Sequence, residues 1–257
     1  MAAWKKFPFP DPAFDYPGNT LKKNWARLHR GDCEPFPADG AAQDAWRAYH
    51  AGDFAKALTL GLDGGPAGIA AANKAAMIHA NHLEEDTETR LRLFEEIAAR
   101  CVAQQQAAPD NPNAWYFHAY ALGRYSQGIS VAKALAQGLG GKIRDSLEQA
   151  LELQPSHADA HIALGTWHAE IIDKVGSLVG GLSYGARKEA SEQHFLTALE
   201  LNPDSAVART EYAEGLLMLF GRSRRKDAER LYAEAAACMP ADAMERLDIE
   251  AARQQLA

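Results

Sequence analysis

Two near-identical segments constrain this chain more than any other feature. ALELQP ends at Pro155 and ALELNP ends at Pro203, and each closes an apolar run with helical spacing. Proline has no N–H and disfavours helical geometry in the residue before it, so each segment is expected to be the end of a helix. Pro240 ends a third run in the same way. The recurrence predicts a chain built from repeated helical units.

The residues before each proline also recur at matching positions. The central unit has His161, Leu164, Gly165, His168, Ser191, Phe195, Ala198 and Pro203; the unit before it has Trp115, His118, Ala119, Leu122, Ile143, Leu147, Ala150 and Pro155; the unit after it has Arg209, Tyr212, Ala213, Leu216, Ala228, Tyr232, Ala235 and Pro240. The Gly or Ala lets one helix approach its partner closely, and larger residues fill the space between turns. This spacing is similar to the tetratricopeptide repeat (TPR).

The fold expected from this likeness is all-α: a TPR-like, right-handed solenoid of helical hairpins with extended inter-helix inserts. The clearest repeats span 113–155, 158–203 and 206–240, within a single helical-repeat domain at 41–257. A plain repeat has about 34 residues, and these are longer. The additions fall at 123–141 and 175–185, where we expect lengthened first helices that lean out of the stack and are joined by glycine-rich turns.

Residues 1–40 form an arm rich in proline and aromatic residues, with Phe7, Phe9, Phe14 and Tyr16 among them. The prolines oppose a long helix, although Asn24 to Arg30 can add a short helical turn. So many rings are unusual in a disordered tail, so we expect the arm to lie along the helical stack. The alternative is that the arm docks on another subunit and makes a homo-oligomer.

Charge and composition exclude several classes of protein. The formal net charge of −7 opposes binding to nucleic acid or to an anionic membrane surface. No apolar run approaches the roughly 20 residues of a membrane span. Cys33, Cys101 and Cys238 form no CxxC pair and are expected to be reduced thiols. With no apolar signal segment at the N-terminus, the sequence predicts a cytoplasmic protein without membrane insertion or a nucleic-acid partner.

Two motifs suggest chemistry but fit the helical pattern poorly. Residues 181–185, GLSYG, match the nucleophile elbow of α/β-hydrolases with Ser183 as nucleophile, yet no strands accompany them. A glycine-rich turn is the preferred interpretation, and a serine hydrolase is the alternative. His157, His161 and His168 could approach a metal, but core packing is preferred. We therefore expect no catalytic residue, no cofactor and no metal.

The concave face of the stack is the predicted binding groove. Its candidate residues, one turn apart on the first helix of each pair, are Asn113, Tyr116, Tyr120, Arg124, Asp159, Thr166, Glu170, Thr210 and Glu214. Tyrosine offers contact area together with a hydrogen bond, which suits capture of a protein segment or a small ligand. The sequence thus predicts a non-enzymatic scaffold that binds a protein, peptide or small-molecule partner.

Two segments carry a closer family resemblance, which covers roughly the C-terminal half. The segment from ALGRYSQGIS to ALGTWHAE, with its turn at 165–168, resembles TPR-like proteins of the regulator-of-microtubule-dynamics family and their bacterial relatives. The segment from EASEQHF to LLMLFGR is similar to the T-component of tripartite ATP-independent periplasmic (TRAP) transporters. The second likeness implies an alternative function as a transporter-associated ligand-binding component.

Overall fold

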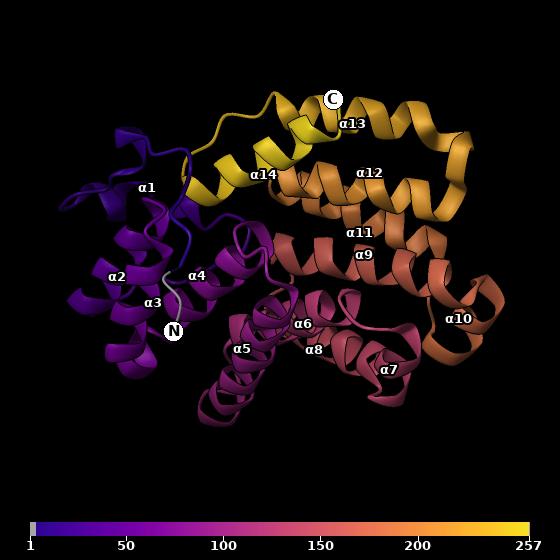
Figure 1. Ribbon diagram of the computed structural model, residues 1–257, viewed down its shortest axis with the longest axis horizontal. Helices are drawn as coiled ribbons and strands as arrows, with labels where there is room; N and C mark the ends of the chain where they lie inside the picture. The colour runs from indigo at the N-terminus through magenta and orange to yellow at the C-terminus, as the bar shows by residue number, and fades with distance from the viewer. Residues whose placement is uncertain (1–3, 257) are drawn as a thin grey trace.

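The computed structural model describes residues 4–256, and every regular element within that range is a helix (Figure 1). The α-helices are α1 (Thr20–Leu28), α2 (Gly40–His50), α3 (Phe54–Asp63), α4 (Ile69–His82), α5 (Thr87–Ala107), α6 (Pro112–Gln127), α7 (Val131–Ala136), α8 (Leu139–Leu153), α9 (Ala158–Val175), α10 (Ser177–Tyr184), α11 (Lys188–Leu201), α12 (Ala206–Phe220), α13 (Arg225–Ala236) and α14 (Ala243–Gln254). The prediction of an all-α, right-handed helical-hairpin solenoid is confirmed.

Side-chain caps fix where several of these helices begin. The Asp86 carboxylate accepts a hydrogen bond from the Thr89 amide at 2.8 Å at the start of α5. Ser205 caps α12 in the same way, accepting from the Ala208 amide at 3.1 Å. Such caps satisfy amide groups that have no partner within the helix.

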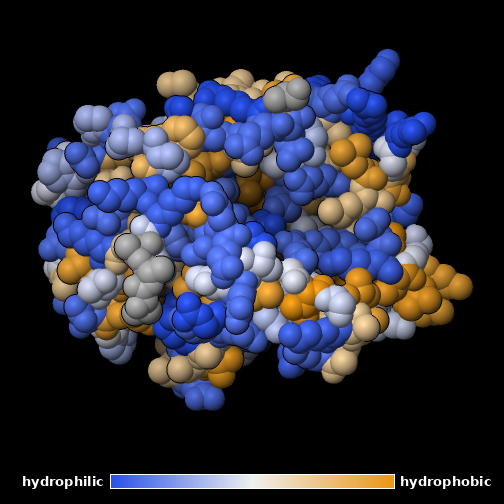
Figure 2. All heavy atoms as spheres, in the orientation of Figure 1, coloured by the Kyte–Doolittle hydropathy of each residue, from blue (hydrophilic) through white to orange (hydrophobic). Residues whose placement is uncertain are grey.

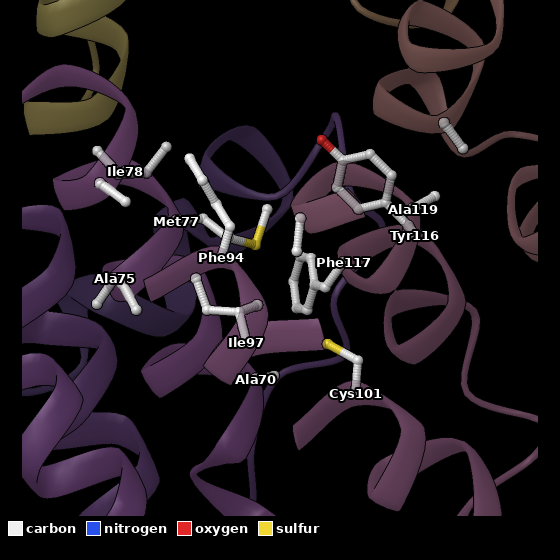
Figure 3. Close-up of a cluster of buried hydrophobic side chains, with 14 of the residues drawn as sticks. Ala70, Ala75, Met77, Ile78, Phe94, Ile97, Cys101, Tyr116, Phe117 and Ala119 are labelled. Carbon is white, nitrogen blue, oxygen red and sulfur yellow. The ribbon is translucent and has the colours of Figure 1, made fainter. Parts of the chain in front are cut away.

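The repeats pack as the glycine and aromatic spacing predicts. Leu164 and Phe195 are 5% and 0% exposed. A Cβ placed on Gly165 would lie 3.1 Å from the Phe195 ring, and one on Gly215 would lie 2.8 Å from it. Because neither glycine has a side chain, α9 and α12 can both pack closely against the Phe195 ring of α11. Figure 3 shows a comparable cluster between α4, α5 and α6, where Phe94, Ile97 and Phe117 point toward one another.

The inserts correct one expectation. They form two separate short helices, α7 and α10, rather than glycine-rich turns between lengthened helices. Gly176 has φ +81°, which ends α9, and Gly185 has φ +74°, which ends α10. Leu178 and Leu182 on α10 are 76% and 82% exposed. Figure 2 shows an apolar area at the right edge, where Figure 1 places α10.

The N-terminal arm packs on its own chain. Phe14 and Trp25 are buried, and the Phe7 ring meets Phe54 of α3 edge-on. The arm's helix, α1, begins at Thr20, earlier than the short turn expected from Asn24. No helix between residues 4 and 256 combines the length and apolarity that crossing a membrane requires.

The C-terminal helix α14 returns from α13 toward the N-terminal helices and contacts α2 and α12 (Figure 1). The Tyr16 hydroxyl donates to the Ala241 carbonyl at 2.6 Å. His50 Nδ1 lies 2.8 Å from an Asp242 carboxylate oxygen. The Arg27 guanidinium donates to both Glu245 carboxylate oxygens, at 2.5 and 2.9 Å. We call these contacts the closure interface, because they join the two ends of the solenoid.

Candidate binding cavity

Closure leaves a cavity on the concave side of the stack. Its wall is made by α4, α6, α9 and the start of α12, with α1 and α14 completing it. The space measures about 1210 Å³, including the part open to solvent, and Figure 2 shows the surface hollowed near its centre. Its apolar lining is Leu28, Met77, Ile78, Ala119, Ile143, Ile162, Ala163, Trp167, Ala206, Val207 and Met244. A concave, largely apolar site with a few polar groups is typical of small-molecule binding.

Six of the nine predicted groove residues line this cavity: Tyr116, Tyr120, Arg124, Asp159, Thr166 and Glu170. They are brought together because α6 and α9 run side by side along the concave face. Asn113, Thr210 and Glu214 are not among the lining residues. Asn113 is buried behind the wall, where its side chain bonds Glu34 and His157.

The repeat pattern missed lining residues both inside and outside the clear repeats. Those outside include Arg27 of α1, Lys74 and Asn81 of α4, and Met244, Glu245 and Asp248 of α14. These residues reach the cavity because the chain closes on itself, and no periodic spacing in the sequence indicates that closure. One signal was available, because Lys74 stands alone among the alanines of α4, and an isolated charge in a buried helix needs a partner.

The cavity's lysine and arginines are already paired with carboxylates. Arg27 binds Glu245 in the closure interface. Arg124 donates to Glu211 at 2.6 Å, and Thr166 donates to the same carboxylate at 3.0 Å. Lys74 donates to the buried Asp32. Asp32 and Asp159 raise the pKa of Lys74 despite its burial, so the ammonium stays charged. These pairs leave little positive charge for an anionic ligand.

Asp159 differs from the other carboxylates of the lining. Glu170 accepts from Gln127 at 2.5 Å and from Lys174 at 2.9 Å, and Asp248 lies 3.3 Å from His82 Nε2. Within residues 4–256, no hydrogen-bond donor or cation is paired with the Asp159 carboxylate. Burial raises the pKa of Asp159 to about 7, against the nearby Lys74 ammonium, which lowers it.

The Asp159 carboxylate is held in place by its backbone and by a glycine. The Asp159 amide donates to the Gly31 carbonyl at 3.0 Å, which joins the start of α9 to the segment after α1. A Cβ added to Gly31 would lie 2.3 Å from Asp159 Oδ1, so a side chain there would displace the carboxylate from its present position. The position of this acid is therefore a built feature of the site.

A buried polar network supports the cavity wall from behind. Asp32 accepts from Lys74 and lies 2.9 Å from His29 Nδ1. The Asn113 amide donates to Glu34 at 2.6 Å, and its oxygen lies 2.9 Å from His157 Nε2. Burial lowers the pKa of His157 to about 4 and raises that of Glu34 to about 8. These groups tie the arm to the first repeat and fix the residues facing the cavity.

The structure contradicts the elbow that a serine hydrolase would need. Ser183 lies within α10, exposed, and not on a strand-to-helix turn. His161 and His194 approach each other at 2.9 Å between their Nδ1 atoms, as residues packed between helices. Across the described part of the chain, no three His, Cys, Asp or Glu side chains are placed to hold a metal ion.

Comparison with known proteins supports the fold. No family model matches the sequence, and no curated protein matches it either. The structure is similar to the crystal structure of TTC0263, a thermophilic TPR protein of Thermus thermophilus, with a TM-score of 0.57 and 19% identity. The match covers 83% of this chain and 97% of that chain. The protein therefore has a TPR-like helical-repeat fold.

Proposed function

We propose that this protein is a non-enzymatic binding scaffold of the cytoplasm whose central cavity holds a small ligand with an apolar body. The observation that carries the proposal is the cavity itself, with apolar side chains from α4, α6, α9 and α14 around a few fixed polar groups. Helical-repeat folds host many functions, so the proposal depends on this site and not on the fold.

Closure favours a small ligand over a long peptide. In an open solenoid an extended segment can lie along the whole concave face. Here α14 returns to the N-terminal helices and contributes Met244, Glu245 and Asp248 to the cavity lining. Within the predicted class of partners, a compact molecule or the end of a chain suits this geometry best.

The likeness to the TRAP T-component implies an alternative function, a transporter-associated ligand-binding component. Such a component would use the same cavity. An enclosed site that holds a small molecule is what such a component requires. The two versions of the proposal differ in what receives the ligand, and they share the cavity as the binding site.

The neutral, apolar dye Nile red tests whether the cavity binds such a molecule. Gly123 lines the cavity on α6, and a Cβ added there meets nothing within 4 Å. Gly123→Phe should therefore fill the space without disturbing the wall. Gly141 on α8 is also helical with open space around it, lies outside the cavity lining and gives the matched control Gly141→Phe.

We expect wild type and Gly141→Phe to bind one Nile red per chain with increased fluorescence, and Gly123→Phe to lose that binding. Circular dichroism and thermal unfolding should show all three proteins folded. Equal dye binding by the three proteins, or none by wild type, would contradict the proposed use of the cavity.

A further inference from the structure

The charge balance of the cavity indicates which ligand it accepts. Five carboxylates line it, against two arginines and a lysine. Arg27, Lys74 and Arg124 are each paired with a carboxylate. Placing an anion here would require one of these pairs to break, which leaves a buried charge without a partner. The lining is better matched to a cation.

Several polar groups of the cavity lining have no protein partner within residues 4–256, among them Asn202 Oδ1, and two others can bind a cation. The Asp159 carboxylate is one, as described above. The other is the hydroxyl of Tyr116, a residue only 7% exposed, for which the described part of the chain offers no hydrogen-bond partner. Figure 3 shows this hydroxyl directed away from the buried cluster beneath the ring. Both groups face the cavity and have no protein partner among the described residues, so they are available to a ligand that supplies donors.

We propose that the ligand carries a protonated amine beside its apolar body, and that Asp159 binds this amine with the Tyr116 hydroxyl as a second acceptor. This inference rests on the proposed function. An ammonium offers three donors and a positive charge, which matches a carboxylate and a hydroxyl oxygen together.

Gly31 bears on where the acid lies. A side chain at this position would meet Asp159 Oδ1 and displace it, so the glycine is compatible with the present position of the carboxylate. Asp159 is half-buried and makes no ion pair in the described structure, although the Lys74 ammonium is near enough to lower its pKa. A bound ammonium would give this carboxylate a charged hydrogen-bond partner.

Three probes with the same apolar body and different head groups test the inference by isothermal titration calorimetry: 4-phenylbutylamine, 4-phenylbutan-1-ol and 4-phenylbutanoate. A charge-assisted hydrogen bond in a buried site corresponds to about a tenfold or greater change in affinity. We expect the amine to bind wild type at least about tenfold more tightly than the alcohol, and the carboxylate to bind most weakly.

Asp159→Asn removes the charge with little change of shape, and it should abolish the preference for the amine while keeping affinity for the alcohol. Because Asn keeps the shape of the side chain and Lys74 keeps its pairing with Asp32, this variant should remain folded, which circular dichroism and thermal unfolding check. Tyr116→Phe should reduce the preference by a smaller factor. Asp173→Asn, on the exposed side of the same helix, is the matched control and should keep the full preference.

Equal affinities for the three probes, or an amine preference that survives Asp159→Asn, would overturn the inference. If Nile red still binds in that case, the proposed function stands, and only the inference that the ligand carries a protonated amine is wrong. If neither Nile red nor any of the three probes binds, both the proposed function and this inference fail.

Discussion

The repeats and the two ends of the chain are held by different kinds of contact. Between α9, α11 and α12, two glycines let helices meet around the buried ring of Phe195. The closure interface adds charged and polar contacts, Arg27 on Glu245 and His50 on Asp242, to the apolar packing of Ala243 and Leu247. The first kind follows a sequence period and contributes apolar burial. The second depends on residues almost the full chain apart and determines the shape of the cavity.

The largest effect is expected in the repeats. Phe195→Ala removes a fully buried ring that α9, α11 and α12 share, and should lower the free energy of unfolding by about 3–5 kcal/mol. Urea denaturation measures the change. Leu196→Ala, the next residue on α11 and 45% exposed, is the control and should change stability by less than about 1 kcal/mol. Similar losses from both variants would show that Phe195 is not the packing centre of these repeats.

The sequence predicted the repeats well because their contacts are local and periodic. Leu164, Gly165 and Phe195 occupy the places that the spacing indicates. The first-helix positions that face the cavity followed from the same period, and six of nine lie in its lining. The short helices α7 and α10 were missed because they are too brief for a helical period and are bounded by glycines.

Closure could not be predicted because it has no period. Asp242 and Glu245 follow the last repeat, and nothing in their spacing indicates His50 and Arg27 as partners. The most informative acid of the cavity, Asp159, was found by its helical position. Its lack of a protein partner is a property of the three-dimensional arrangement alone.

Two N-cap variants compare the regions directly. Asp242 caps α14 through the Glu245 amide at 2.9 Å and also binds His50, whereas Ser205 only caps α12. Ser205→Ala should cost about 1 kcal/mol, and Asp242→Ala about 2–3 kcal/mol because the closure contact is lost as well. Urea denaturation gives both values, and hydrogen exchange should show α14 opening selectively in Asp242→Ala. If the two variants lose the same amount of stability, the contact between Asp242 and His50 contributes nothing to the free energy of unfolding.

Glu34 tests the buried network behind the cavity wall. Burial, with nearby Asp32, raises its pKa from 4.5 to about 8, while Asn113 and Lys74 lower it. The folded state therefore keeps a proton that the unfolded state loses above pH 4.5, so this residue makes stability fall with rising pH up to about 8.

Glu34→Gln removes that titration and leaves an oxygen to accept from Asn113. Its stability relative to wild type should therefore increase between pH 5 and 8, by at most about 1.4 kcal/mol per pH unit. Urea denaturation at several pH values measures the difference. A difference that stays constant with pH would show that Glu34 titrates normally.

The central claim is that the chain closes on itself around the cavity, and a double-mutant cycle on Arg27 and Glu245 tests it most directly. Unfolding free energies of wild type, Arg27→Met, Glu245→Gln and the double variant give the coupling between residues at opposite ends of the chain. The bidentate, partly buried pair predicts a coupling of about 1 kcal/mol or more. A coupling of zero would mean that the two ends do not meet, and would contradict the closed cavity.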